Sequence, residues 1–289
     1  MPKKGRGADL HIHSNFSDGT LSPAQIAEMA ARAALSAISI TDHDTVEGIS
    51  ASVVACEMNG LRFIPGVELS ADDEHGREIH IAGLFVDFED ENLLGELARL
   101  REGRRKRIHG MCERLQELNI PITSEEVFQI AGDASPGRPH LAHALLRAGY
   151  VASVPEAFWK YIGADGPAYV EREKLSAREG IQLLKRARAV TILCHPGYLS
   201  PFGEDEARNL KDLGIDAIEA YSPYHDPSEV EAYLRLAKKF SLGVSGGSDF
   251  HGFRRDEAPI GSVRLPEEHL EDLLRRTCPE SRYDLGSKE

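Results

Sequence analysis

The chain has 289 residues and carries 34 lysines and arginines against 47 aspartates and glutamates, a formal charge of −13. Hydrophobic residues make up 41% of the chain and charged residues 28%, a balance that argues against disorder, collagen and coiled coil. The length suits one large domain, or one domain with an insertion. The acidic balance argues against a protein that binds long nucleic-acid duplexes through its own positive surface.

No apolar run approaches the ~20 residues that span a bilayer, and no apolar segment follows the basic N-terminus MPKKGRGADL. The four cysteines form no C-x-x-C pair, which indicates free thiols in a reducing compartment. We therefore expect a cytoplasmic protein without membrane contact, and the sequence indicates no particular oligomeric state. The cysteines are Cys56, Cys112, Cys194 and Cys278.

Short β-rich runs alternate with helical patterns in the first 89 residues. Ser22 and Pro23 are typical of a helix start, and Asn59-Gly60 is a stop signal. Because strands and helices alternate, the pattern predicts a largely parallel sheet or barrel. The expected order is a strand at 8–14, a helix from Ser22, a strand at 37–41, a helix at 46–58 and strands at 62–69 and 78–86.

The alternation breaks between about residues 90 and 166. Leucine and other apolar positions between Leu93 and Leu118 predict a long helix or a helical pair, and three shorter helices follow at 124–131, 139–148 and 155–162. We therefore expect residues 90–166 to form an all-helical insertion in a domain made of 1–89 and 167–289. In that second part, the expected order is helix 177–187, strand 190–194, helix 204–213, strand 217–220, helix 227–240 and strand 242–245.

Histidines and carboxylates recur at the predicted strand ends. His11 and His13 lie at positions i and i+2 of the first strand, so both imidazoles face the same side. In a parallel barrel the carboxyl ends of the strands meet at one mouth, which gathers these residues in one ring. The ring comprises His11, His13, Asp18, His43, Glu68, His80, His195, Asp249 and His251.

Six imidazoles and three carboxylates form a donor set that suits Mn, Zn or Fe(II). Nine ligands exceed the needs of one ion, so the set predicts a site of two or three metals. Glu68 is the best candidate for a carboxylate that bridges neighbouring ions.

The motifs that carry these residues resemble those of the PHP (polymerase and histidinol phosphatase) family. The resemblance implies an α/β fold, a distorted seven-stranded (β/α) TIM-like barrel, with a trinuclear metal site. It implies that His11, His13, Glu68 and Asp249 hold one metal, that Glu68, His80 and His195 hold the second, and that Asp18, His43 and His251 hold the third. The motifs are His11-Ile12-His13 with Ser17-Asp18-Gly19, Thr41-Asp42-His43-Asp44, Pro65-Gly66-Val67-Glu68, His80, Cys194-His195-Pro196 and Ser248-Asp249-Phe250-His251.

Within that family the chain looks like the stand-alone phosphoesterases that remove the 3′-phosphate from nucleoside 3′,5′-bisphosphates. Relatives of that subgroup also trim short RNA from its 5′ end. This resemblance implies a small nucleotide or a short RNA end as the partner, and two or three divalent ions, Mn first and Zn, Fe or Mg as alternatives. It rests on the insertion, on Gly137-Arg138-Pro139-His140-Leu141-Ala142 and on Ala168-Tyr169-Val170.

We expect the metals to generate a hydroxide that attacks phosphorus in line and to neutralise charge on the phosphoryl oxygens. The leaving ribose oxygen needs a proton or a metal; either His251 or the third metal fills this role, and the sequence does not choose between them. Arg138 offers a planar guanidinium fork that suits a phosphate, with His140 as an assistant. The alternative is that Arg138 only caps or salt-bridges the insertion. His225, with Tyr224, is a candidate for lining a base pocket.

A basic run from Arg99 to Arg107 stands out in this acidic chain. Such a run is usually the solvated face of a helix, and the alternative is that one or two of its arginines reach over the barrel mouth. Two or three bound divalent ions would add about four to six positive charges at that mouth. The net charge of −13 is therefore compatible with a small nucleotide or the end of a short RNA.

Three other functions share some of these sequence features. A histidinol-phosphate phosphatase, or another small phosphomonoesterase, would share the metal ligands but needs no nucleotide-holding insertion. A C–N hydrolase also uses His-x-His and a late Asp, but usually with one or two metals. A module that binds or stabilises a polymerase is disfavoured because every ligand position is filled.

Overall fold

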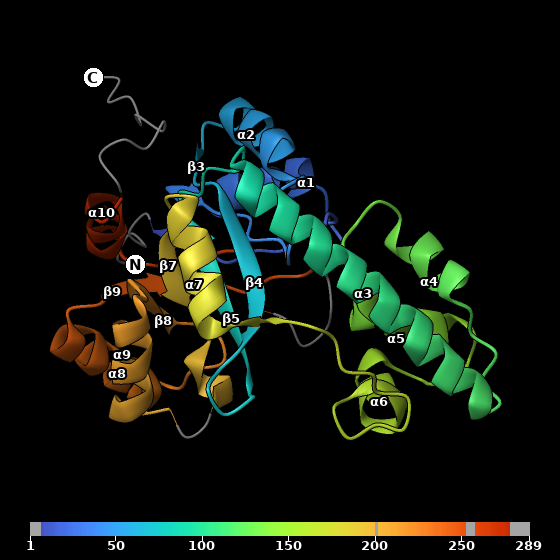
Figure 1. Cartoon of the computed structure of the whole chain (residues 1–289). Coiled ribbons are helices and arrows are strands. Elements are labelled where there is room, and N and C mark those ends of the chain that lie inside the picture. The colour runs from blue at the N-terminus through green and yellow to red at the C-terminus, as the bar shows by residue number, and fades with distance from the viewer. Residues whose placement is uncertain (1–6, 200–201, 253–257, 278–289) are drawn as a thin grey trace.

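Nine strands form two hydrogen-bonded sheets in the computed structural model, which describes residues 7–199, 202–252 and 258–277 (Figure 1). The first sheet is parallel and contains β1 (Ala8–Asp9), β2 (Ala37–Ile38) and β3 (Arg62–Phe63). The second has the order β6 (Leu175–Ser176), β4 (Gly66–Asp72), β5 (Glu78–Leu84), β7 (Val190–Leu193), β8 (Ala217–Tyr221) and β9 (Gly243–Gly246).

The strand β5 runs antiparallel to both of its neighbours, β4 and β7, so the prediction of a largely parallel sheet is wrong for this strand. The reason is the short turn that precedes it, because a parallel partner would need a long crossover connection. Asp73 accepts hydrogen bonds from the backbone N–H groups of His75 and Arg77, both at 2.8 Å. Gly76 adopts φ +73°, which a residue with a side chain rarely adopts.

Backbone pairing also joins the two sheets at both edges. Ile12 forms an isolated parallel bridge with Phe250, beyond β9, and His43 forms one with Glu68 of β4. The segments that follow β1 and β2 therefore lie between β9 and β4. This pattern confirms an α/β fold.

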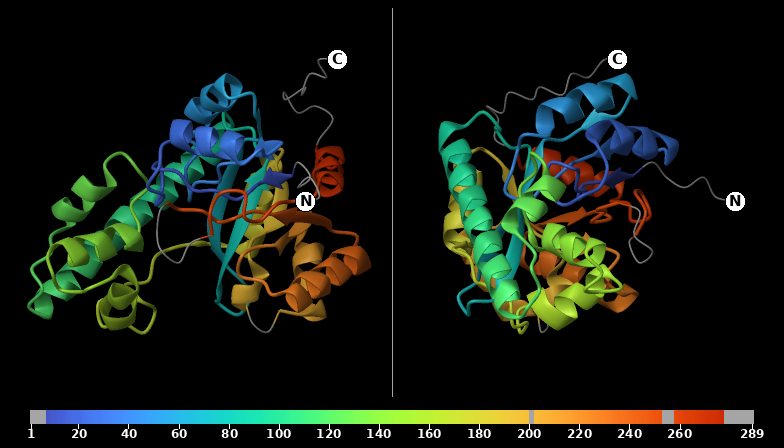
Figure 2. Two further views of the ribbon diagram at one scale, coloured as in Figure 1. Left: turned by 180° about the vertical axis from the view of Figure 1, so that it is seen from behind. Right: turned by 90° about the vertical axis from the view of Figure 1, so that its right-hand side faces the viewer.

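Six helices cover the sheets, and Figure 2 shows them from two further sides. Ser22 caps the first, as predicted, because its side chain accepts from the N–H of Gln25 while the Gln25 side chain accepts from the N–H of Ser22. The strand β6 and the last helix, α10, were not predicted. The helices are α1 (Pro23–Arg32), α2 (Ile49–Met58), α7 (Ala177–Arg186), α8 (Glu204–Leu213), α9 (Pro227–Phe240) and α10 (Glu267–Arg275).

The segment predicted as an insertion is helical and extends to one side of the sheets (Figure 1). The long apolar pattern forms one helix, α3, rather than a pair. Its first turns bury Leu93, Leu97 and Leu100 in the main core, whereas its later turns bury Ile108 and Met111 in a separate core. The elements are α3 (Glu91–Glu117), α4 (Ser124–Ala131), α5 (Arg138–Arg147), α6 (Val154–Ala157) and a π-helical turn (Phe158–Ile162).

The cysteine and membrane predictions can be compared with the described part of the chain. Cys56, Cys112 and Cys194 are buried free thiols, while Cys278 lies outside the described residues. Among the helices described, none combines the length and the apolar character needed to cross a membrane.

Candidate active site

All nine predicted metal ligands lie together where the two sheets meet. Eight of them follow the expected strands or lie on β4, but His80 reaches the site in another way. It lies near the start of β5, opposite Ser70 of β4. Because β5 is antiparallel, its beginning lies beside the carboxyl end of β4. The expectation that His80 belongs to a parallel strand is therefore wrong, although its place in the ring is the expected one.

Glu68 lies at the centre of this ring and is wholly buried. Its two carboxylate oxygens face different groups of histidines, which is the arrangement that a bridging carboxylate needs. Its Oε1 lies 3.3 Å from His11 Nε2, 3.1 Å from His80 Nδ1 and 3.3 Å from His195 Nε2. Its Oε2 lies 3.1 Å from both His13 Nε2 and His43 Nδ1.

Two aspartates complete the ring on either side of His13. Asp249 Oδ1 lies 3.2 Å from His13 Nε2 and 3.3 Å from His11 Nε2. Asp18 lies farther from its neighbours, at 3.9 Å from His13 Nδ1 and 3.5 Å from His251 Nε2. The His251 ring is oriented by its other nitrogen, Nδ1, which lies 2.8 Å from the carbonyl oxygen of Asp249.

The donor atoms of this ring fit divalent cations better than they fit one another. Ring nitrogens of His11, His13, His43 and His80 are buried without a hydrogen-bond partner in the described structure, and so is Glu68 Oε2. Burying an unpaired polar atom is costly, so such a concentration of them fits a site that binds cations. The ligand atoms gather, within 4.8 Å of one another, as His13–Asp18–His43–His251, His11–Glu68–His195, His11–His13–Asp249 and His43–Glu68–His80.

Electrostatics within the ring also favours cations. Burial by itself would raise the pKa of Glu68, but the surrounding histidines hold it well below its usual range. Burial would likewise lower the pKa of His13 and His80, yet neighbouring carboxylates raise these pKa values to about 10 and about 9. Burial lowers the pKa of His43 to about 3. Protons therefore occupy part of the ring when no metal is bound, and metal binding must displace them.

Glu219, on β8, is a buried carboxylate that sequence reasoning missed. One of its oxygens lies 3.1 Å from His11 Nδ1, and the other accepts the backbone N–H of His195 at 2.6 Å. The first contact leaves His11 Nε2 as the nitrogen that faces Glu68 and Asp249. The second supports the backbone of His195, which adopts an unusual φ of +28°. In the sequence, a glutamate inside the apolar strand Ala217–Tyr221 could have indicated a buried functional carboxylate.

Asp42 and Asp44 flank His43 and support the ring from outside. Asp42 accepts hydrogen bonds from the Ser14 hydroxyl and the Ser17 hydroxyl, both at 2.6 Å, and so shapes the loop that carries Asp18. Asp44 is fully buried and lies 2.6 Å from Arg104 Nε. Both residues belong to the Thr41–Asp44 motif, in which the sequence predicted a role for His43 alone.

Arginines from the helical segment and from the residues just after it converge beside the ring. Arg104 of α3 reaches Asp44, so this residue of the basic run extends to the site rather than into solvent. Arg172 also lies near Asp44, at 3.4 Å, and Arg138 lies 3.8 Å from Glu78 Oε1. Arg107 is buried, and its Nε donates to the Val170 carbonyl at 2.7 Å.

We call these four arginines the arginine group (Arg104, Arg107, Arg138 and Arg172), and the carboxylates near them include Asp44, Glu78 and Asp18. Burial, together with a neighbouring arginine in each case, lowers the pKa of Arg107 and of Arg172 to about 10. Such a concentration of positive charge in a partly buried place favours an anion.

The comparisons with known proteins agree with this geometry. A family model described as "PHP domain" matches residues 9–103. A 5′-3′ exoribonuclease of Haemophilus influenzae is 31% identical over 246 residues, which cover 84% of this chain and 89% of the relative. The chain belongs to the PHP family. The matched segment ends within α3, so His195, Asp249 and His251 lie beyond it.

Two further PHP comparisons extend over nearly the whole chain. A 3′,5′-nucleoside bisphosphate phosphatase of Chromobacterium violaceum is 29% identical over 270 residues, which cover 92% of each chain. The solved structure of a Bifidobacterium adolescentis protein, named as a metal-dependent phosphoesterase, has a TM-score of 0.88 and 28% identity. It covers 95% of this chain and 97% of its own.

The structure places two of the three predicted substrate contacts beside this PHP site. Arg138 begins α5, with its side chain partly exposed, and His140 lies two residues further on, in the same first turn. His140 Nδ1 accepts the N–H of Gly137 at 3.0 Å, so the other ring nitrogen must carry the proton of the neutral ring. Burial lowers the pKa of His140, which keeps the ring neutral.

His225 lies in a different setting from the predicted one. Its ring is buried, with Nδ1 at 2.9 Å from the Ala220 carbonyl oxygen and Nε2 accepting the N–H of Gly197 at 3.2 Å. Both ring nitrogens are thus engaged by the backbone. Tyr224 instead faces the ring of predicted metal ligands, and its hydroxyl donates to Asp249 Oδ2 at 3.0 Å.

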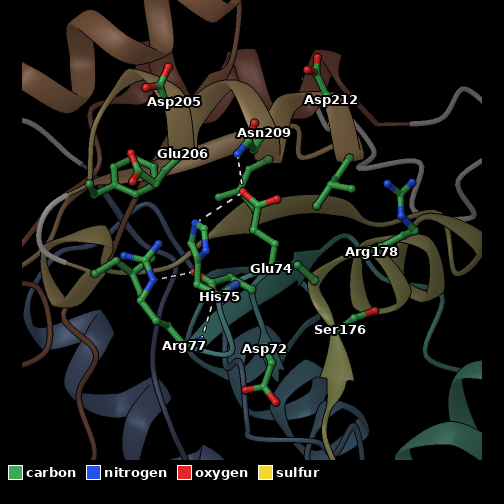
Figure 3. A pocket seen from close by; sticks show the side chains of 16 residues that line it. Asp72, Glu74, His75, Arg77, Ser176, Arg178, Asp205, Glu206, Asn209 and Asp212 are labelled. Carbon is green, nitrogen blue, oxygen red and sulfur yellow. Dashed lines mark hydrogen bonds and ion pairs between the residues drawn. The ribbon is translucent and has the colours of Figure 1, made fainter.

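A hollow of about 490 Å³ lies elsewhere, between the β4–β5 turn and α8 (Figure 3). Its lining includes Glu74, His75 and Asn209, and the Asn209 amide donates to Glu74 at 2.6 Å. None of the nine predicted metal ligands lines it. The predicted metal ligands therefore lie outside this hollow.

Proposed function

We propose that this protein is a metal-dependent phosphatase that removes the 3′-phosphate of nucleoside 3′,5′-bisphosphates and also trims short 5′-phosphorylated oligoribonucleotides. The observation that carries the proposal is the juxtaposition of the nine-residue ring with the arginine group. The ring suits cations that act on one phosphate, and the arginines suit a second anionic group of the same substrate. The names of the two curated relatives support this reading.

We infer that the strands form a distorted barrel around this site. The bridges at Ile12–Phe250 and His43–Glu68 support closure, because they join the first sheet to both β9 and β4. The separate core of the helical segment supports a cap domain over residues 90–166, inserted between barrel parts 1–89 and 167–289. In this arrangement α3 connects the cap rigidly to the barrel.

We propose that the ring holds two or three divalent ions, with Mn as the first expectation and Zn, Fe or Mg as alternatives. Imidazole and carboxylate donors together support this range of metals. Glu68 is the shared ligand, because its two oxygens contact different histidines. When bound, the ions lower the pKa of a water molecule and offset negative charge on phosphoryl oxygens.

Residues outside the metal sites bind the substrate, and backbone contacts orient the ring of His251. Arg138 and Arg104 bind the phosphate oxygens of the substrate, and the protonated nitrogen of His140 donates a further hydrogen bond. His251 keeps Nε2 directed at Asp18, because its Nδ1 is engaged by the Asp249 carbonyl. This orientation places Nε2 either as a ligand or as the proton donor for the leaving ribose oxygen.

The experiment that tests the proposal compares three substrates. Purified, Mn-loaded protein is incubated with adenosine 3′,5′-bisphosphate, histidinol phosphate and a 5′-phosphorylated pentaribonucleotide, and released phosphate and nucleotides are measured. We expect turnover of the two nucleotide substrates and little of histidinol phosphate. Turnover of histidinol phosphate alone would replace the proposed function by the histidinol-phosphate phosphatase alternative.

A further inference from the structure

Two tyrosines beside the metal ring expose large aromatic surfaces. Tyr198 belongs to the short 3₁₀ helix Pro196–Leu199 and is 63% exposed, while Tyr224 is 39% exposed. Their ring centroids lie 4.8 Å apart with an interplanar angle of 42°. We call this pair the tyrosine platform. Single exposed aromatic rings are common on protein surfaces, but two rings in contact beside a site offer a contiguous apolar surface that a ligand can cover.

The tyrosine platform is in direct contact with predicted metal ligands. The Tyr198 ring lies 5.2 Å from the His195 ring, and the Tyr224 hydroxyl donates to Asp249 Oδ2 at 3.0 Å. A molecule whose phosphate occupies the metal ring would therefore extend its adjoining group over these rings. The arginine group lies on the β4–β5 side of the site, so the platform and the arginines flank the ring on different sides.

The platform is held in place without any ligand. His225 bonds the N–H of Gly197 at one ring nitrogen and contacts the Ala220 carbonyl with the other, which ties the two tyrosine-bearing loops together. Gly197 packs so closely that a Cβ there would lie 2.8 Å from His225 Cδ2. A preformed surface of this kind binds a flat group at little cost in conformational entropy.

We propose that Tyr198 and Tyr224 form a stacking site for the nucleobase of the substrate. This inference rests on the proposed function and specifies it: the alcohol released from the phosphate carries a planar base. Tyrosine suits the role because it offers a rigid, flat apolar face with few rotatable bonds. Stacking of a base on an aromatic side chain strengthens binding about 5- to 150-fold by its usual magnitude.

Calorimetric titration of the metal-loaded protein tests the stacking site without requiring turnover. The ligands are 5′-AMP and ribose 5-phosphate, which share the phosphate and the sugar and differ in the base. We expect wild-type protein to bind 5′-AMP about 5- to 150-fold more tightly. Tyr198→Ala should reduce this preference to less than about 3-fold, and Tyr198→Phe should keep it because stacking needs the ring and not the hydroxyl.

Trp159→Ala provides the matched control, since Trp159 is an 81% exposed aromatic residue on the cap. We expect it to leave the preference for 5′-AMP unchanged. Equal affinities of wild-type protein for the two ligands would overturn the stacking site, and so would an undiminished preference in Tyr198→Ala. Loss of the preference in both the Ala and the Phe variants would also overturn it. Failure of nucleotide turnover with an intact preference would reject the proposed reaction and not the stacking site.

Discussion

The Glu219→Gln substitution tests one hydrogen bond, the one between Glu219 and His11 of the metal ring. The Glu219 carboxylate contacts His11 Nδ1 at 3.1 Å and accepts the N–H of His195 at 2.6 Å. A glutamine has the same shape but only one acceptor oxygen. If that oxygen keeps the His195 N–H, the amide NH₂ faces His11 Nδ1, and this nitrogen can then no longer donate.

The substitution therefore moves the proton of neutral His11 to Nε2, the nitrogen that faces Glu68 and Asp249. A protonated nitrogen has no lone pair for a metal. Loss of such an orienting partner typically weakens metal binding by about 10- to 100-fold, which is about 1.4 to 2.8 kcal/mol. We expect this loss for the metal that His11 ligates, while the other ions stay bound.

Metal content after dialysis and competition with a chelator measure the effect, and neither requires activity. Asp216→Asn is the control, because Asp216 lies just before β8 and pairs with Lys185 and Thr191 rather than with a metal ligand. Wild-type metal affinity in Glu219→Gln would refute the orienting role. An equal loss in the two variants would also refute it, because the cause would then be a general weakening of the fold.

Three further predictions concern the substrate, the metal-free protein and the core. Arg138→Ala should raise the KM for adenosine 3′,5′-bisphosphate by about 10- to 150-fold, the usual value of a charged hydrogen bond, and more than for a simple phosphate ester; an equal rise in steady-state assays of both substrates would contradict a specific contact. In metal-free protein, the raised pKa values of His13, about 10, and His80, about 9, exceed the unfolded value of about 6.5. Their contribution to the free energy of unfolding is therefore fully present below about pH 6.5 and lost as the pH rises through 9 to 10; urea unfolding in a chelator at pH 6, 8 and 10 tests this, and a rising contribution would contradict it. Leu100→Ala should cost about 2 to 5 kcal/mol in urea unfolding, whereas Leu94→Ala, at an exposed position of the same helix, should cost less than about 1 kcal/mol.

Local signals in the sequence predicted most helices well. Ser22, Asp90 and Thr123 each cap a helix through their side chains, and such capping depends only on neighbouring residues. The helices at Ser124–Ala131, Glu204–Leu213 and Pro227–Phe240 have the predicted ends. The gathering of the candidate metal ligands in one ring was also predictable, because their motifs lie at strand ends and metal chemistry restricts their residue types.

What the sequence alone determined was the set of local elements, the residue types able to bind metal and the family resemblance. The tertiary structure decided the direction of β5, and with it how His80 enters the ring, because strand pairing is a long-range interaction. It also decided which charges are buried together: Arg104 meets Asp44 and Glu219 meets His11 across 60 and 208 positions of the chain. The same holds for His225, which was predicted to line a base pocket and whose two ring nitrogens meet backbone groups of two loops. Partners so distant along the chain leave no local pattern, because only packing of the complete core brings them within hydrogen-bond reach.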